Sequence, residues 1–143
     1  MNPKATRKSP PARERILLVD DEDLVRTMIK MVLGFRGYQV AEAEDGIDAV
    51  EKFRAASPKI DLVLMDYHLP RLNGQEALLR IREIDPKLPA VIFSGGLHDG
   101  IGDGGLEGVA FLHKPFENDE LFRLVRELLD ARGIAGVKPA QVQ

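Results

Sequence analysis

The sequence alternates short apolar runs with longer segments in which apolar residues recur every three or four positions, and this alternation constrains the fold more than any other feature. The apolar run at residues 16–19, for example, is followed directly by Asp20 and Asp21. Such a run is typical of a strand that is buried on both faces. Similar runs predict five strands, at residues 16–19, 39–43, 61–66, 89–93 and 109–112.

Segments of helical period separate these runs. In the first segment Gly34 and Gly37 mark the predicted end of an amphipathic helix, and Asp45 is a suitable N-cap for the second. We expect the methionines to lie mainly at core positions. The apolar faces are predicted to consist of Val25, Met28, Ile29, Val32 and Leu33, of Ile47, Val50 and Phe53, of Ala77, Leu78, Ile81 and Ile84, and of Leu121, Leu124, Val125 and Leu128.

Strands that alternate with helices imply right-handed crossovers and a parallel sheet covered by helices on both faces. We therefore predict an α/β fold, the flavodoxin-like doubly wound sheet of five parallel strands in the order 2-1-3-4-5. The helix between the fourth and fifth strands is predicted to be short or irregular. Residues 95–108 are rich in glycine, and each glycine inside a helix costs about 0.5–1 kcal/mol relative to alanine.

Length and composition fit a single domain, since 143 residues suffice for one core and not for two. We expect residues 1–14 to form a disordered basic lead-in, residues 15–132 the domain and residues 133–143 a flexible tail. The net charge of -3 argues against direct nucleic-acid binding, and no apolar run approaches the ~20 residues of a membrane span. The absence of cysteine excludes disulfides and thiolate sites and favours a cytoplasmic location.

Polar residues follow the predicted strands at the point where each strand ends. In an open parallel sheet these ends meet at one edge, where ligands bind. Crowded carboxylates repel one another and raise each other's pKa, so a hard divalent cation with oxygen ligands, Mg²⁺, is the natural counter-ion. The residues at this edge are Asp20 and Asp21 after the first strand, Asp66 after the third, Ser94 after the fourth and Lys114 after the fifth.

This constellation suits phosphoryl transfer to a carboxylate, which forms an acyl phosphate. A metal ion and Lys114 would neutralise charge on the transferring oxygens. The hydroxyl of Ser94 and the backbone N–H of Gly95 are candidates to bind the remaining phosphoryl oxygens.

The same motifs resemble the signature of the response-regulator receiver family of two-component signalling. The resemblance covers residues 15–132 and includes several separated motifs in order. They are Asp20-Asp21, Asp66 with Leu69-Pro70 and Gly74 behind it, Ser94-Gly95 and Lys114-Pro115-Phe116. The sequence departs from the family in the segment after Ser94, which is rich in glycine where the fourth helix is expected. In this feature the chain is similar to receivers associated with hybrid histidine kinases. The departure affects the usual signalling face of the family.

The resemblance implies a role for each matched residue. Asp66 would be the phosphoacceptor and Lys114 would contact the phosphoryl group. Ser94 would be the switch hydroxyl, and Phe111 the switch aromatic. The Lys114–Pro115 peptide bond would be cis, a conformation found in about one in twenty X-Pro bonds. The Mg²⁺ ligands would be the carboxylates of Asp20, Asp21 and Asp66 and the backbone carbonyl of His68.

The resemblance also implies a function. The chain would be a stand-alone receiver, a switch rather than a turnover enzyme, that takes a phosphoryl group from a histidine kinase or a histidine phosphotransfer protein. It would signal to a downstream protein by contact or by onward phosphotransfer, as a monomer or a weak phosphorylation-dependent dimer.

Two other interpretations remain open at this point. The segment from Asp21 to Val25 fits the loose Asp-x-Asp-x-Thr/Val pattern of haloacid-dehalogenase-like phosphatases. That interpretation leaves Asp66 unexplained, and the chain after Lys114 lacks the further acidic pair that such an enzyme needs. The other interpretation is a receiver fold that serves as a phosphate-independent interaction module.

Overall fold

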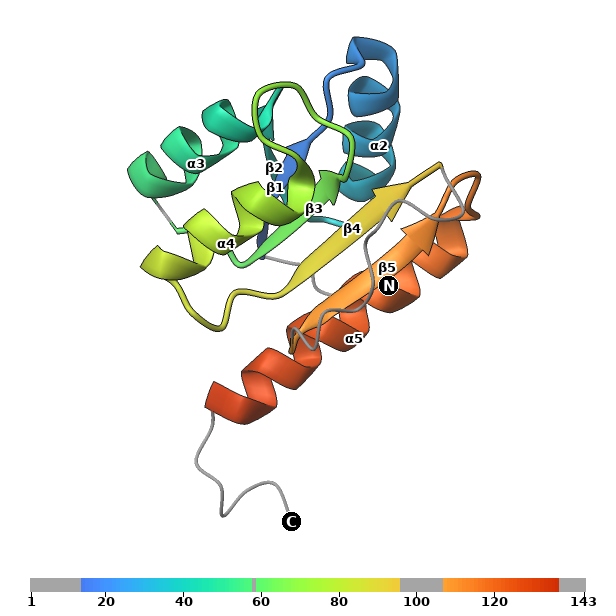
Figure 1. The fold of residues 1–143 in the computed structure, drawn as a ribbon. Helices are drawn as coiled ribbons and strands as arrows, with labels where there is room; N and C mark the ends of the chain where they lie inside the picture. Colours follow the sequence, from blue (N-terminus) through green and yellow to red (C-terminus); the bar gives the residue numbers. More distant parts are fainter. Residues whose placement is uncertain (1–13, 58, 96–106, 137–143) are drawn as a thin grey trace, which may run out of the picture.

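A sheet of five parallel strands in the order β2-β1-β3-β4-β5 forms the centre of the molecule (Figure 1). The computed structural model describes residues 14–57, 59–95 and 107–136, with side chains up to Arg132. The strand order confirms the predicted flavodoxin-like doubly wound sheet.

The strands lie within a residue of their predicted positions. The interior strands β1, β3 and β4 are buried on both faces, which explains their continuous apolar runs. The edge strands β2 and β5 are only partly buried. The bounds are Arg15–Val19 for β1, Gln39–Ala43 for β2, Leu62–Asp66 for β3, Ala90–Ser94 for β4 and Val109–His113 for β5.

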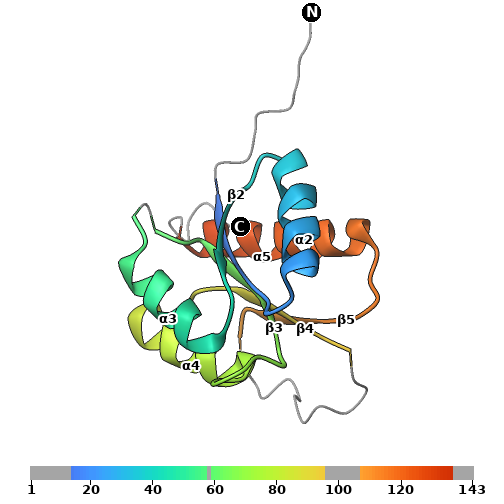
Figure 2. The same ribbon diagram turned by 90° about the horizontal axis from the view of Figure 1, so that it is seen from above.

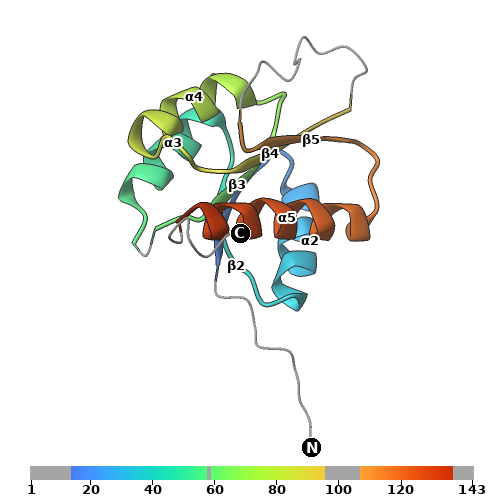
Figure 3. The same ribbon diagram turned by 90° about the horizontal axis from the view of Figure 1, so that it is seen from below.

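The described helices are α2 (Asp23–Phe35), α3 (Gly46–Ala55), α4 (Gly74–Ile84) and α5 (Asn118–Gly136). Helices α2 and α5 cover one face of the sheet, and α3 and α4 cover the other (Figures 2 and 3). As predicted, Asp45 caps α3, because its side chain accepts a hydrogen bond of 2.7 Å from the Asp48 N–H. Asn73 and Glu76 form a capping box at the start of α4.

Alternate residues of each central strand enter two separate core layers. In β1, Leu17 and Val19 pack with α3 and α4, whereas Ile16 and Leu18 pack with α2 and α5. The two-residue period of a strand produces this division. The sheet is therefore held from both sides, and its strand ends are rigid positions for functional residues.

Several apolar residues that were expected in the core are exposed. Met28 and Met31 of α2 are 64% and 57% exposed, and Ile84 of α4 is 44% exposed. The prediction that methionines lie mainly in the core is wrong for these two, although Met65 is fully buried. Helix α2 is apolar on two sides, with Leu24, Met28, Met31 and Phe35 facing solvent, and spacing alone does not tell which side is covered.

Regular structure and ion pairs extend just beyond residues 15–132, the range expected for the domain. Helix α5 continues to Gly136 rather than ending near Arg132, and Arg132 ties it to Asp85 through an ion pair of 2.8 Å. Glu14, expected in the lead-in, is bound to the domain through Arg126 at 2.8 Å and through the N–H of Gln39 at 3.1 Å.

Other predictions lie outside the described residues. These are the lead-in at residues 1–13, most of the glycine-rich segment, at residues 96–106, and the tail at residues 137–143. Among the described helices, none combines the length and the apolar character that crossing a membrane requires.

Candidate functional site

The structure brings the predicted acidic residues together at the carboxyl edge of the sheet. One carboxylate oxygen from each of Asp20, Asp21 and Asp66 lies within 4.8 Å of the others. The Nζ of Lys114 lies 3.2 Å from Asp66 Oδ2 and 3.9 Å from Asp20 Oδ2. Because β1 and β5 flank the β3-β4 pair in the sheet, residues far apart in the sequence converge on one point.

Asp66 is the best-anchored carboxylate of this group. It ends β3 and is almost fully buried. Its Oδ1 accepts a hydrogen bond of 3.1 Å from the His68 N–H, and its Oδ2 accepts one of 3.2 Å from Lys114. Both carboxylate oxygens of Asp66 therefore have a hydrogen-bond donor that holds them in place.

Gly74, the first residue of α4, lies directly behind the backbone of Asp66. Its N–H donates a hydrogen bond of 2.7 Å to the carbonyl of Tyr67. A Cβ at this position would come within 2.6 Å of the Asp66 carbonyl oxygen and 3.0 Å of the Tyr67 Cα. These neighbours are backbone atoms and cannot move aside cheaply, so residue 74 must be glycine for α4 to approach the end of β3 so closely.

Asp20 is fully buried, and its side chain is only half satisfied. Oδ1 accepts a hydrogen bond of 2.8 Å from the Glu22 N–H, whereas Oδ2 has no hydrogen-bond partner among the described residues. Burial raises the pKa of Asp20 above its ordinary value, and the charges of Asp66 and Asp21 raise it further, against the lowering effects of the Glu22 N–H and Lys114.

The oxygen of buried Asp20 that lacks a hydrogen bond, together with the carboxylates of Asp21 and Asp66, forms a set of oxygen donors that suits a hard divalent cation. Mg²⁺ binds oxygen ligands and is commonly held by one or two carboxylates while it keeps several waters. Asp21 is exposed to solvent, which leaves one side of the cluster open to such waters. The residues present therefore fit the magnesium ion that the sequence predicted.

Lys114 reaches the acidic cluster from the end of β5. Its N–H donates to the Ser94 carbonyl at 2.8 Å, and the Lys114–Pro115 peptide bond is cis, as predicted. The ammonium group lies 4.9 Å from the centre of the Phe93 ring, and this ring packs edge-on against Phe116. Phe93 was not among the residues predicted for this site. Its position immediately before Ser94, as an aromatic residue at the end of a strand, could have indicated it.

The predicted switch residues lie on neighbouring strands. Ser94 ends β4 and is almost fully buried, and it pairs in register with His113 of β5. Phe111 of β5 is 36% exposed rather than packed in the core. Gly95 is exposed, and a Cβ there would meet nothing within 4 Å. His68 is exposed and its ring packs edge-on against Tyr67.

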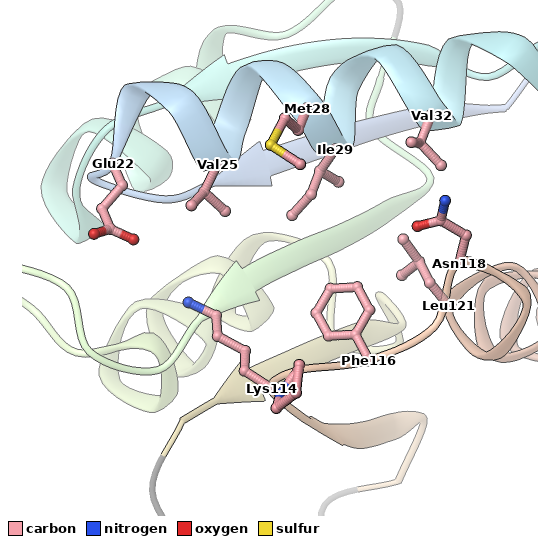
Figure 4. A pocket seen from close by; sticks show the side chains of 10 residues that line it. Glu22, Val25, Met28, Ile29, Val32, Lys114, Phe116, Asn118 and Leu121 are labelled. Carbon is pink, nitrogen blue, oxygen red and sulfur yellow. The ribbon is translucent and has the colours of Figure 1, made fainter.

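A groove of about 530 Å³ runs beside the acidic cluster, between α2 and the segment that joins β5 to α5. Figure 4 shows Glu22 and Lys114 at one end of this groove and Asn118 and Leu121 at the other. The remaining lining is mainly apolar and consists of Val25, Met28, Ile29, Val32, Pro115 and Phe116. The groove thus joins the acidic cluster to the exposed apolar side of α2.

Comparisons with known proteins agree with this geometry. The model of the response regulator receiver domain matches residues 16–126. The chemotaxis protein CheY of Treponema pallidum is 36% identical over 128 residues, which are 87% of this chain and 89% of that protein. The chemotaxis protein CheY of Bacillus subtilis is 39% identical over 119 residues, 81% of this chain and 98% of that protein.

Solved structures agree as well. The receiver domain from the hybrid histidine kinase CckA is 34% identical, with a TM-score of 0.67 over 80% of this chain and 98% of that chain. The strand order, the acidic cluster and these similarities lead to one conclusion. This chain belongs to the response regulator receiver domain family.

Proposed function

We propose that the protein accepts a phosphoryl group on Asp66 from a phosphohistidine of a histidine kinase or a histidine phosphotransfer protein. The observation that carries this proposal is the position of Asp66, a nearly buried carboxylate 3.2 Å from the Lys114 ammonium and next to the Asp20–Asp21 pair. Membership of the receiver domain family supports a role in two-component signalling, and we propose that the chain acts there as a switch rather than as a turnover enzyme.

In the proposed step a carboxylate oxygen of Asp66 attacks the phosphorus of the donor. The phosphorus–nitrogen bond of the phosphohistidine breaks, its electron pair stays on the imidazole, and an acyl phosphate forms on Asp66. The Lys114 ammonium stabilises the negative charge on the transferring oxygens, with the Ser94 hydroxyl and the Gly95 N–H as further donors.

A magnesium ion held by Asp20, Asp21, Asp66 and the backbone carbonyl of His68 would neutralise charge on the phosphoryl oxygens. The unsatisfied Oδ2 of buried Asp20 supports this ligand set. Helix capping does not account for Asp20 and Asp21, because the N-cap residue of α2 is Glu22 and no side-chain capping hydrogen bond is present there.

Phosphorylation of Asp66 would change the positions of side chains on the neighbouring strands β4 and β5. Ser94 would move toward the phosphoryl group, and Phe111 would pack into the space that this movement leaves, which biases a two-state surface. The partly exposed position of the Phe111 side chain supports such repacking. The signal would then pass to a downstream protein by contact or by onward phosphotransfer, from a monomer or a weak dimer that forms on phosphorylation.

A protein donor is supported by the surface beside the site. The apolar groove begins at Lys114, and exposed Leu24 and Met28 extend this apolar surface along α2. Exposed apolar surface of this kind marks interaction sites in soluble proteins. The similarity to the receiver of a hybrid histidine kinase points to the same class of donor.

Acetyl phosphate with Mg²⁺, followed by intact mass measurement, tests the proposal. We expect the wild-type chain to gain one phosphoryl group and Asp66→Asn to gain none. Asp61→Asn is the matched control, because Asp61 lies just before the opposite end of β3, where it accepts the Arg15 N–H at 2.8 Å. No mass gain in any condition, or a gain that persists in Asp66→Asn, would contradict the proposal. Multiple turnover of a small phosphoester would favour the phosphatase interpretation instead.

A further inference from the structure

Arg26, in the first turn of α2, joins three separate parts of the site's surroundings. Its side chain is 16% exposed, and its guanidinium donates to three acceptors among the described residues. Nη1 donates to the Asp20 carbonyl at 2.7 Å, Nε to Glu42 Oε1 at 3.1 Å and Nη2 to Asp23 Oδ1 at 2.6 Å. One side chain therefore connects α2, the end of β1 and the edge strand β2.

The bond to the Asp20 carbonyl has a consequence for Asp21. This carbonyl belongs to the peptide group that contains the Asp21 nitrogen, and a peptide group is planar. The N–H of Asp20 is also held, at 3.2 Å from the Ala43 carbonyl. With both backbone groups of Asp20 bound, the direction in which the chain enters Asp21 is defined.

The side chain of Asp21 has no comparable support of its own. It is exposed, and its carboxylate receives no hydrogen bond from any residue that the structure describes. Its position near Asp20 and Asp66 therefore depends on the backbone on either side of it, which is held by Arg26 at the Asp20 carbonyl and by Asp20 Oδ1 at the Glu22 N–H. Removing the guanidinium would leave only the second of these supports and widen the range of positions open to the Asp21 carboxylate.

Glu42 in turn holds Arg26. It accepts the Arg26 Nε–H and also the Lys30 ammonium at 2.8 Å. The hydrogen bond from Lys30, assisted by that from Arg26, lowers the pKa of Glu42 below its ordinary value, so the carboxylate stays charged at neutral pH. Lys30 shares the partner Glu42 with Arg26 but does not contact Asp20.

We infer that Arg26 is a positioning residue of the metal site, which holds the Asp20–Asp21 peptide so that the Asp21 carboxylate faces Asp20 and Asp66. The inference rests on the proposed binding of Mg²⁺ by these carboxylates. The forked, planar guanidinium meets acceptors in three directions at once, which a lysine ammonium on its flexible stem does not do in one geometry.

Calorimetric titration of the metal-free protein with Mg²⁺ tests this inference without any reaction. Loss of residues that orient metal ligands typically lowers affinity about 10- to 100-fold, and we expect Arg26→Met to raise the Kd for Mg²⁺ about 10-fold. Arg26→Lys, which restores charge but not the fork, should lie between this variant and wild type. Lys30→Met is the matched control, because Lys30 lies on the same helix as Arg26 and also donates to Glu42. Its Kd for Mg²⁺ should stay within about twofold of wild type.

A second measurement separates positioning from general damage to the fold. In phosphorylation by acetyl phosphate, the Mg²⁺ concentration for half-maximal rate should rise in Arg26→Met, whereas the rate at saturating Mg²⁺ should approach that of wild type. Equal Kd values for wild type and Arg26→Met, or an equal loss in Lys30→Met, would overturn the inference. If Arg26→Met does not fold in EDTA, the Kd for Mg²⁺ is measured for Arg26→Lys and Glu42→Gln instead. Unchanged Kd values in both variants would overturn the inference as well.

The failure of this inference differs from the failure of the proposed function. A wild-type protein that binds Mg²⁺ and gains a phosphoryl group, beside an equally competent Arg26→Met, overturns only the role of Arg26. A wild-type protein that binds no Mg²⁺ overturns the proposed metal site and, with it, the inference.

Discussion

Replacing Asp20 by asparagine should stabilise the metal-free protein and weaken its response to Mg²⁺. Asp20 is fully buried, and its Oδ2 lies 3.9 Å from Lys114 Nζ. At an effective dielectric constant of about 20, that attraction amounts to about 4 kcal/mol. The carboxylate oxygens of Asp20 and Asp66 lie within 4.8 Å of each other, which gives a repulsion of about 3.5 kcal/mol or more.

These two interactions nearly cancel, so the desolvation of the Asp20 carboxylate is offset mainly by the Glu22 N–H at Oδ1, while Oδ2 has no hydrogen bond. Mutational data place the cost of burying an incompletely hydrogen-bonded polar group at about 1–3 kcal/mol. Asparagine keeps an oxygen for the Glu22 N–H and places an amide donor where Oδ2 has no partner. We therefore expect Asp20→Asn to gain roughly 1–3 kcal/mol in the free energy of unfolding when no metal is present.

Urea and thermal unfolding followed by circular dichroism at neutral pH would measure this difference. In EDTA the melting temperature of Asp20→Asn should be higher by roughly 3–10 °C. Mg²⁺ at about 100 times its Kd should then stabilise wild type by about 2.7 kcal/mol and the variant by less. Asp21→Asn is the control: because Asp21 is exposed, its stability in EDTA should stay within about 0.5 kcal/mol of wild type, while stabilisation by Mg²⁺ is reduced.

A lower stability of Asp20→Asn in EDTA would refute the reasoning, because it would mean that the buried carboxylate is already satisfied without a metal ion. Equal stabilisation of wild type and Asp20→Asn by Mg²⁺ would show that Asp20 is not part of the metal site.

Four further substitutions give separate checks. Gly74→Ala should lower the free energy of unfolding by more than about 2 kcal/mol, since its Cβ meets backbone atoms, whereas Gly34→Ala, with nothing within 4 Å, should raise it by about 0.5–1 kcal/mol in urea unfolding. Asn73→Ala should cost about 1 kcal/mol in the same assay through loss of the capping box. The hydrogen bond from Arg126 lowers the pKa of Glu14 from its ordinary 4.5, so ionised Glu14 stabilises the fold above that pH and the effect is lost as pH falls through the lowered value. Glu14→Gln should therefore be less stable than wild type by up to about 1 kcal/mol at pH 7, and the difference should shrink as the pH falls below 4.5 in unfolding measured across the pH range.

Much of this protein follows from local pattern. Buried parallel strands must be apolar on both faces, so the runs before Asp20 and Asp66 predicted strands, their parallel arrangement and the edge where the carboxylates meet. The cap at Asp45 was also predictable, since it depends on residues close together in the chain. The cis bond before Pro115 was expected only from the resemblance to the receiver family.

The tertiary structure alone decided which apolar surfaces are covered and which side chains meet. Helix α2 is apolar on two sides, and only packing against the sheet shows that Ile29 is buried whereas Met28 is exposed. The unsatisfied oxygen of Asp20, the ring of Phe93 beneath Lys114 and the bond from Arg26 to the Asp20 carbonyl are likewise three-dimensional facts. The sequence alone determined which side chains stand at the ends of the strands, because strand and helix periods are local. Distances, burial and partners depend on contacts between segments far apart in sequence, which no local pattern specifies.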